Sequence, residues 1–328
     1  MNIGTVGTNF IVDVFSDAVS KTSKAEIKAC YSRTAGTAEA FAKKHQFSKW
    51  YTDKKEFLSD ADLDFIYVAA PNALHYGWAK DALNAGRNVI CEKPFVSRAG
   101  ELEELIALAK QKGLFLFEAI TTPHLPSFHK LKEKIGEIGK VRLVQLTFSQ
   151  YSSRYNAFLE GKLPNLFNPA FSGGALMDLN YYNVVFLYHL FGNPKELKYI
   201  ANQAANGIDL SGVLVFIYDG FIATASATKD SESKNYIQLQ GEKGYFSSES
   251  TAGGLRGGFS LVTKEKTEQF NEQEYENVLY YEVQDFIKDW ESGDPSCCDV
   301  PLQHSLAVSK LMDVARKDAG IVFDADKA

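Results

Sequence analysis

The chain has 328 residues, of which 45% are hydrophobic and 23% charged, enough to bury a sizeable core. At roughly 150 residues per domain, this length predicts two domains. The formal net charge is −6 and the sequence contains no basic block. This argues against a general nucleic-acid binder, because neutralising phosphates requires clustered Lys and Arg.

The first residues, "MNIGTVG", are typical of a strand, and no charged segment followed by a long apolar stretch indicates a secretion signal. The apolar runs are shorter than the roughly 20 residues that a membrane span requires. The four cysteines show no C-x-x-C spacing and the six histidines form no H-E-x-x-H motif, so we expect reduced thiols and no metal site. These patterns predict a cytoplasmic protein without a membrane partner.

The first third of the chain alternates strand-like runs with helical patterns. Stretches such as "AGTAEAFAKKH" and "ELEELIALAKQKG" repeat their apolar residues at spacings of three and four, as amphipathic helices do. Such alternation predicts βαβ units and a doubly wound, parallel Rossmann sheet in an α/β domain of residues 1–120. The expected strands are residues 2–6, 26–32, 65–69, 88–91 and 114–118.

The first strand-to-helix turn, "GTVGTNFI", is a candidate pyrophosphate site. Gly7 could allow a tight turn into a helix whose N-terminus faces the phosphates. The full G-x-G-x-x-G is absent, because Asn9 and Val12 occupy its second and third glycine positions, and many other turns begin with Gly. Asn9 is still suitable, since Asn caps helices and tolerates positive φ. The candidate cofactor residues of this turn are Gly7, Thr8, Asn9, Phe10 and Ile11.

The second strand ends in "CYSRT". An NAD-binding Rossmann domain usually carries Asp or Glu at this point for the adenosine ribose, whereas Ser32 and Arg33 suit the 2′-phosphate of NADP. NADP is therefore the expected cofactor. The alternative is an exposed Arg33 on a surface turn, with NAD as the cofactor.

The segment "VICEKPFV", residues 89–96, places Glu92 and Lys93 at the end of an expected strand. In a doubly wound sheet, ligands bind beyond the carboxyl ends of the strands, so both charges could lie where cofactor and substrate meet. The alternative is a loop ion pair, which contributes about 0–1 kcal/mol when exposed.

The pattern changes after Pro123 to long alternating strands. In "SGVLVFIYDGFIATASATKD", Asp219 and Gly220 between two apolar runs predict a hairpin turn. These runs predict an α+β domain, residues 121–328, with a large, open, mostly antiparallel sheet. An open face of this size often marks a subunit interface, so we expect a homo-oligomer through it.

Within this half, "NPAFSGGALMDLNYYNVVFLYHLFGNP" predicts a helix from near Gly174 to a stop at Gly192. Asp178 and Tyr182 are four residues apart and are expected to share one face of this helix. A carboxylate beside a phenol can position a hydroxyl and pass a proton. The alternative is that Tyr182 is a core aromatic and Asp178 an acid favoured by the helix dipole.

Together, "GTVGTNFI", "YVAAPNALHYGWAKDALNAGRNVICEKPF", "LFEAI" and "NPAFSGGALMDLNYY" resemble the glucose-fructose oxidoreductase, inositol dehydrogenase and MocA family over nearly the whole chain. The resemblance implies an N-terminal domain that binds NAD or NADP and a C-terminal domain whose open sheet covers the nicotinamide. It also implies cofactor-binding roles for Ala70, Pro71, Asn72, His75, Glu92 and Lys93.

The same resemblance implies catalytic roles for Lys93, Asp178 and Tyr182. Lys93 would hold the reacting hydroxyl, Tyr182 would act as acid/base, and Asp178 would orient a neighbouring hydroxyl or Lys93. Tyr182, together with the Ser-Arg pair after the second strand, is similar to the dihydrodiol dehydrogenase-like branch. Asn9 stands where the family has its second fingerprint glycine, which could alter the affinity for the pyrophosphate. Asn180 stands where the family has a motif glycine beside the proposed substrate pocket, so the resemblance does not identify the substrate.

These expectations describe an oxidoreductase that transfers a hydride between NADP(H) and an alcohol or carbonyl of a sugar, polyol or diol. Two alternatives stay open. One is a cofactor-retaining, sugar-modifying enzyme on the same scaffold, and the other is a non-catalytic NAD(P)-sensing regulator. The presence of Lys93, Asp178 and Tyr182 argues against the regulator.

Overall fold

The computed structural model describes residues 1–327, which divide into two compact units. The first contains Met1–Ala119 and Asn277–Leu306, and the second contains Ile120–Glu276 and the residues from Ala307 onward. Residues 277–306, predicted above as part of the second domain, belong to the first unit. The reason is packing, because Phe286 stacks on Phe117 with ring centroids 4.8 Å apart and Trp290 meets the edge of Phe65.

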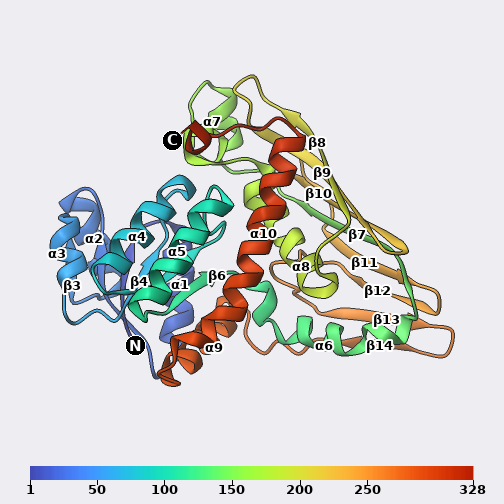
Figure 1. The fold of residues 1–328 in the computed structure, drawn as a ribbon, viewed down its shortest axis with the longest axis horizontal. Coiled ribbons are helices and arrows are strands. Elements are labelled where there is room, and N and C mark those ends of the chain that lie inside the picture. The colour runs from blue at the N-terminus through green and yellow to red at the C-terminus, as the bar shows by residue number, and fades with distance from the viewer. Residues whose placement is uncertain (328) are drawn as a thin grey trace. The chain divides into compact units, whose positions relative to one another are not determined.

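Within the described chain, the first unit is built on a six-stranded parallel sheet of order β3-β2-β1-β4-β5-β6 (Figure 1). Its strands are β1 (Asn2–Val6), β2 (Glu26–Tyr31), β3 (Lys49–Tyr51), β4 (Phe65–Val68), β5 (Asn88–Glu92) and β6 (Leu116–Ala119). Its helices are α1 (Phe10–Ser20), α2 (Ala35–His45), α3 (Lys54–Ser59), α4 (His75–Asn84), α5 (Ala99–Lys112) and α9 (Leu279–Glu291). The predicted doubly wound Rossmann sheet is confirmed, and its strand order reverses between β1 and β4.

The strands at the centre of this sheet are buried on both faces. Every side chain of β4, "FIYV", is buried, as expected where helices cover both sides of a parallel sheet. On one side Tyr67 of β4 stacks on Phe15 of α1, with ring centroids 3.8 Å apart. A continuous apolar strand of this kind carries the clearest sequence signal, which is why the expected strand of residues 65–69 is found.

Within residues 120–327, the second unit contains an eight-stranded sheet of order β14-β13-β12-β11-β7-β10-β9-β8. Its strands are β7 (Val141–Ser149), β8 (Glu196–Gln203), β9 (Asp209–Tyr218), β10 (Phe221–Thr228), β11 (Tyr236–Gly241), β12 (Gly244–Ser248), β13 (Phe259–Thr263) and β14 (Thr267–Phe270). Strands β7 and β10 pair in parallel, and the other neighbours pair antiparallel. The predicted mostly antiparallel sheet is confirmed, as is the hairpin that joins Tyr218 to Phe221.

The helical segments that belong to this unit include α6 (Pro126–Lys134), α7 (Tyr155–Leu159), a π-helix (Leu176–Asn180) and α8 (Tyr181–Phe191). One face of the sheet packs on the π-helix and α8, where Ala227 of β10 meets Ala175 and Leu179 (Figure 1). On the opposite face, Ile200 is 72% and Ile222 is 46% exposed. The strands therefore bury one face and leave apolar side chains exposed on the other.

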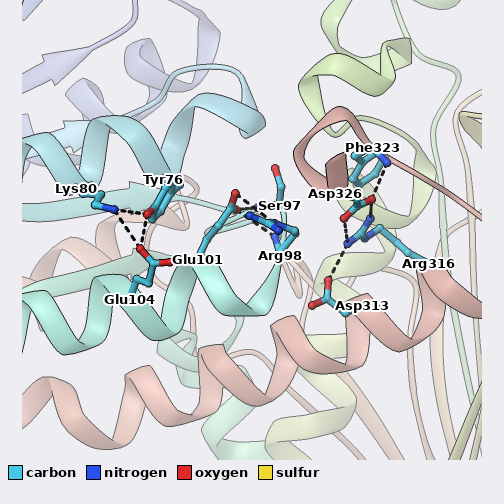
Figure 2. Close-up of polar contacts among 10 residues, drawn as sticks. All are labelled: Tyr76, Lys80, Ser97, Arg98, Glu101, Glu104, Asp313, Arg316, Phe323 and Asp326. Carbon is cyan, nitrogen blue, oxygen red and sulfur yellow. Dashed lines mark hydrogen bonds and ion pairs between the residues drawn. The ribbon is translucent and has the colours of Figure 1, made fainter. Parts of the chain in front are cut away.

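The C-terminal segment is fastened to α10 (Asp299–Asp318) by Arg316, as Figure 2 shows. The guanidinium donates to Asp326 at 2.7 Å and to Asp313 at 2.9 Å, and it lies 4.6 Å from the ring centroid of Phe323. α10 has 20 residues, yet neither it nor any other helix of residues 1–327 is long and apolar enough to cross a membrane.

Candidate active site

The turn after β1 requires a glycine at position 7. Gly7 has φ +108°, a backbone conformation that residues with a Cβ rarely adopt. A Cβ at this position would lie 2.6 Å from the carbonyl oxygen of Ala69, which follows β4. The backbones of the β1 and β4 ends thus approach closely at the point where the strand order reverses, which is where doubly wound sheets bind ligands.

Asn9 joins the start of α1 to the end of β4. Its Oδ1 accepts a hydrogen bond from the Val12 amide at 3.4 Å, and its Nδ2 donates to the Ala69 carbonyl at 2.8 Å. The predicted helix cap is confirmed. The tolerance of Asn for positive φ is not used, because Asn9 has extended backbone with φ −95°. A glycine is therefore not needed at this second fingerprint position.

The residues of this turn fit a dinucleotide pyrophosphate. The first N–H groups of a helix lack intrahelical partners and carry its positive dipole end, so the start of α1 favours an anion. Thr8 and Ile11 are partly exposed and Phe10 is 78% exposed, which leaves the helix start accessible. Gly7, Thr8, Asn9, Phe10 and Ile11 are thus together at one helix start.

Ser32 and Arg33 follow β2, the neighbour of β1 in the sheet. The Ser32 amide donates to the Tyr51 carbonyl at 3.1 Å, which fixes the turn, and the Arg33 side chain is exposed. Helix α2 begins two residues after Arg33, behind Thr34, whose side chain makes no capping bond. An exposed guanidinium beside a helix start suits a phosphate group.

His75 braces two loops of the candidate cofactor site. Ala70, Pro71 and Asn72 follow β4 and are partly exposed. The buried His75 ring contacts the Ala70 carbonyl at 2.8 Å through Nε2 and the Pro94 carbonyl at 2.9 Å through Nδ1. Burial lowers the pKa of His75, although the two carbonyls oppose this shift. His75 would therefore act on a cofactor through the loops that it joins.

Glu92 is buried, unlike the exposed loop ion pair considered as the alternative above. Glu92 ends β5, is 7% exposed, and accepts a hydrogen bond from the Tyr67 hydroxyl of β4. Burial raises the pKa of Glu92 to about 7, while Tyr67 and Lys93 oppose the shift and Glu118 adds to it. Lys93 follows at the end of the strand and is partly buried.

The loop after Lys93 is held by the next helix. Glu101, in the first turn of α5, accepts hydrogen bonds from the Ser97 amide at 3.0 Å and the Arg98 amide at 3.2 Å (Figure 2). The Glu101 side chain is 90% buried, so this carboxylate serves the backbone and has little exposure to solvent. The chain that follows Lys93 is thereby fixed at both ends of its turn.

The helix that carries Asp178 begins at Ala175, close to the predicted start, but its first turn is a π-helix. Gly174 has φ +105°, and a Cβ there would lie 1.9 Å from Oδ1 of Asp209. The buried Asp209 carboxylate accepts from the Leu176 amide at 2.6 Å and from the Tyr199 hydroxyl at 2.7 Å. The sequence predicted a continuous α-helix, whereas π-turns inside helices often mark functional sites.

Asp178 has an ion-pair partner within its own unit. Nζ of Lys229, which follows β10, donates to Oδ2 of Asp178. Sequence reasoning missed Lys229, since a lysine after an alternating strand reads as an ordinary strand end. The expected role of Asp178 in orienting a hydroxyl or Lys93 stays a prediction.

Tyr182 is in the first turn of α8 and is partly exposed, unlike a fully buried core aromatic. A Cβ on Gly253 would lie 2.6 Å from its ring, and the ring centroid of Phe148 is 6.0 Å away. The Gly253 carbonyl accepts a hydrogen bond from Thr121 at 2.6 Å. Gly253 therefore lets the backbone approach the tyrosine and hold its ring.

Asn180 is fully buried. Its Oδ1 accepts from the Asn183 side chain at 2.9 Å. In residues 1–327, no group of three or more His, Cys, Asp or Glu side chains is arranged to hold a metal ion.

The structure thus contains a Rossmann unit with a tight glycine turn at its switch point, and a second unit with a tyrosine and an ion-paired aspartate on a helix that packs on an open sheet. This combination is consistent with a nicotinamide-dependent oxidoreductase. The family models match both parts: "Oxidoreductase family, NAD-binding Rossmann fold" over residues 1–120 and "GFO/IDH/MocA C-terminal domain" over residues 128–247. The chain belongs to the Gfo/Idh/MocA family of oxidoreductases, which confirms the resemblance.

Curated relatives match over nearly the full length. The chain is 35% identical to scyllo-inositol 2-dehydrogenase (NADP⁺) of Bacillus subtilis, over 98% of each chain. It is 27% identical to mouse trans-1,2-dihydrobenzene-1,2-diol dehydrogenase, over 99% of this chain and 98% of the relative. The crystal structure of a 3-ketoreductase from Actinomadura kijaniata with NADP and TDP-benzene superposes with a TM-score of 0.85 at 21% identity, over 97% of each chain.

The protein is therefore an enzyme, an NAD(P)-dependent oxidoreductase that acts on CH–OH groups. Its Rossmann unit binds the nicotinamide dinucleotide. A non-catalytic sensing role is thereby disfavoured.

Proposed function

We propose that the protein transfers a hydride between NADP(H) and an alcohol or carbonyl group of a sugar, polyol or diol. The observation that carries this proposal is that Tyr182, which is partly exposed, and Asp178, which is ion-paired, lie four residues apart on one helix of the second unit. The names of the relatives support the substrate class, since one acts on scyllo-inositol and another on a dihydrodiol.

Two of the three proposed catalytic residues, Lys93 and Tyr182, would act at the reacting oxygen, and Asp178 would act at a neighbouring hydroxyl. When bound, the nicotinamide would supply or accept the hydride. Tyr182 would give or take the proton of the alcohol oxygen, and Lys93 would place a positive charge beside that oxygen. Asp178 would accept a hydrogen bond from a neighbouring substrate hydroxyl. Acid/base assistance of this kind is typically worth about 10² to 10⁴ in rate.

We assign cofactor binding to the first unit and substrate binding to the second. The support for this division is that Gly7, Asn9 and Arg33 follow neighbouring strands of the Rossmann sheet. Asp178 and Tyr182 belong to the second unit. Lys93 belongs to the first unit and would contribute from the cofactor side.

A substrate panel tests the proposed function. Inositols, sugars and dihydrodiols are supplied with NADP, and the absorbance of the reduced nicotinamide is followed. We expect sustained net reduction of NADP with at least one polyol or diol. Product formation without net consumption of NADP would favour the cofactor-retaining alternative, and absence of any product across the panel would contradict the proposal.

The cofactor preference is predicted to depend on Arg33. NADP should bind about 10-fold or more tightly than NAD, because a hydrogen bond to a charged group contributes about 1.5–3 kcal/mol. Arg33→Gln should remove most of this preference while leaving the affinity for NAD unchanged, which is the internal control. Titration against intrinsic Trp fluorescence measures both affinities, and equal wild-type affinities for the two cofactors would refute the assignment.

The exposed sheet face is predicted to form a homodimer. Its apolar side chains Ile200 and Ile222 are 72% and 46% exposed, and burying them would release water from apolar surface. Ile222→Lys should shift the mass measured by light scattering from dimer toward monomer. Val314→Lys, at a comparably exposed position on α10, is the control and should leave the mass unchanged. A wild-type monomer at micromolar concentration would contradict this prediction.

A further inference from the structure

Lys229 is 2% exposed, which is unusual for a lysine unless its charge is paired. Its Nζ donates to Oδ2 of Asp178, 51 residues earlier in the chain. Its backbone is also fixed, because its amide donates to the Leu210 carbonyl at 2.8 Å and its carbonyl accepts from the Ser152 amide at 2.9 Å. Lys229 is therefore held in place independently of its ion pair.

The backbone bond to Ser152 joins Lys229 to an aromatic segment. Strands β7 and β10 are parallel, so their carboxyl ends, Ser149 and Thr228, pair at one edge of the sheet. The chain that follows β7 carries Tyr151, which is 40% exposed, and Tyr155, with ring centroids 5.6 Å apart. Lys229 thus stands where the segment after β7 and the π-helix of Asp178 meet the same sheet edge.

The two side chains of the ion pair differ in their exposure to solvent. The Lys229 side chain is 3% exposed, whereas the Asp178 side chain is 23% exposed. A buried pair of this kind is weak evidence for stability, because desolvation of both charges offsets much of their attraction. The Asp178 carboxylate is nevertheless partly exposed while its countercharge, Lys229, is buried. A carboxylate placed in this way can accept a hydrogen bond from a ligand.

Lys229 also influences the start of the same helix. Asp209, fully buried, binds the Leu176 amide at 2.6 Å, and burial raises the pKa of Asp209 while the charge of Lys229 opposes that shift. The two polar anchors of this helix, Asp209 at its start and Lys229 at Asp178, therefore both come from the sheet.

We propose that Lys229 is a positioning residue of the reaction, whose buried ammonium holds the Asp178 carboxylate in one orientation to accept a hydrogen bond from a substrate hydroxyl. This inference rests on the proposed function and deepens it. Lys229 acts through Asp178 and does not need to touch the substrate. A misplacement of about 1 Å in a positioning group can cost about 10²-fold in rate, which sets the expected size of the effect.

Lys229→Met tests the inference, since it keeps the aliphatic stem and removes the charge. With a substrate from the panel, kcat should fall about 10²-fold, and NADP affinity should stay within a few fold. The acid limb of the pH profile should also move to higher pH, because a carboxylate without its countercharge protonates more readily.

Lys134→Met is the matched control for loss of an ion-paired lysine. Lys134 is 18% exposed and pairs with Glu137 at 3.2 Å and Glu268 at 3.0 Å. This variant should lower Tm without changing kcat or the pH profile.

Two further variants separate positioning from folding. Asp178→Asn with Lys229→Met removes both charges, so it should recover Tm relative to Lys229→Met alone, because no buried charge is left unpaired. Its kcat should match that of Asp178→Asn alone, since residues that act as a unit are non-additive. Lys229→Arg keeps a cation, so its kcat should be at least tenfold higher than that of Lys229→Met. These two variants decide the question if Lys229→Met does not fold.

The outcomes are distinguishable from failure of the proposed function. If the wild type is active and a folded Lys229→Met variant has the same kcat, the role of Lys229 is overturned but the proposed function is not. Losses that multiply in the double variant would also overturn it, because Lys229 would then not act through Asp178. A wild type without turnover on any sugar, polyol or diol would instead refute the proposed function itself.

Discussion

Lys93→Met and Tyr182→Phe should each lower kcat by about 10² to 10⁴ while leaving NADP affinity within a few fold. The reason is that Tyr182 is assigned to proton transfer and Lys93 to charge stabilisation at the substrate oxygen. The start of α1 and Arg33 are instead assigned to binding the cofactor phosphates. Tyr182→Phe keeps the ring that packs against Gly253 and Phe148, so Tm should be unchanged. Steady-state kinetics on an accepted substrate measure the loss.

Combining the two substitutions should cost much less than the product of the single losses, because groups acting as one unit are non-additive. Tyr245→Phe is the control for loss of a tyrosine hydroxyl, at a 38% exposed position on β12, and should be silent. Near-normal turnover of the Tyr182→Phe enzyme would leave Lys93 as the acid/base candidate and refute the role assigned to Tyr182.

The Rossmann unit could be predicted from the sequence because its strands are continuous apolar runs between amphipathic helices. β3 is the exception. Its three residues, "KWY", begin with a charge and none is fully buried, so no strand pattern was visible. The return of α9 to the first unit could not be predicted either, because its partners Phe65 and Phe117 are more than 160 residues away in the chain.

In the second unit, alternation predicted the strands but not how they pair. The parallel pairing of β7 with β10 depends on contacts between segments about 80 residues apart, such as Ala225 opposite Leu146. The π-turn at Asp178 could not be predicted from local sequence either. The turn begins next to Gly174, which is packed so closely against Asp209 of β9 that a Cβ would clash, and Asp209 is 35 residues further along the chain.

Candidate site residues could be proposed from the sequence where they belong to short local motifs. Residues whose position depends on tertiary packing were missed. The Asn9 cap and the Lys93, Asp178 and Tyr182 candidates came from short motifs. The residues that support them, Lys229 and Gly253, have ordinary local surroundings. Their positions matter because folding buries a charge beside Asp178 and brings a bare backbone against the Tyr182 ring.

A buried group of carboxylates should make the protein less stable as the pH rises. Glu92 of β5, Glu118 of β6 and Glu282 of α9 are 7%, 7% and 1% exposed, respectively. Burial raises the pKa of Glu92 to about 7 and that of Glu282 well above its ordinary value. Repulsion from Glu118 adds to both shifts, and repulsion from Glu92 adds to that of Glu282. Glu92 and Glu282 therefore retain protons in the folded state that the unfolded chain releases.

The sign follows from proton binding. Between pH about 4.5 and 7 the folded state binds more protons at Glu92 than the unfolded state, so the free energy of unfolding falls as the pH rises. A shift from 4.5 to about 7 corresponds to about 3 kcal/mol for this group alone, at about 1.4 kcal/mol per pH unit. Partly exposed acids with lowered pKa, such as Asp13 beside Lys44, act in the opposite sense and at lower pH.

Glu282→Gln should relieve part of this loss, because an amide of similar shape has no proton to release. Oε2 of Glu282 has no hydrogen-bond partner among the described residues, so ionising this side chain would leave a buried charge without compensation. Relative to wild type, the variant should have nearly the same free energy of unfolding at pH 5 and a higher one at pH 8. Urea titrations at several pH values between these limits measure the difference.

Glu291→Gln provides the comparison on the same helix. Glu291 is exposed and pairs with Lys24 at 2.7 Å, so its substitution should change the free energy of unfolding little and by the same amount at pH 5 and pH 8. A Glu282→Gln effect that is equally independent of pH would show that the Glu282 carboxyl keeps its ordinary pKa in the folded state. The buried carboxylates would then not be the cause of the loss of stability at higher pH.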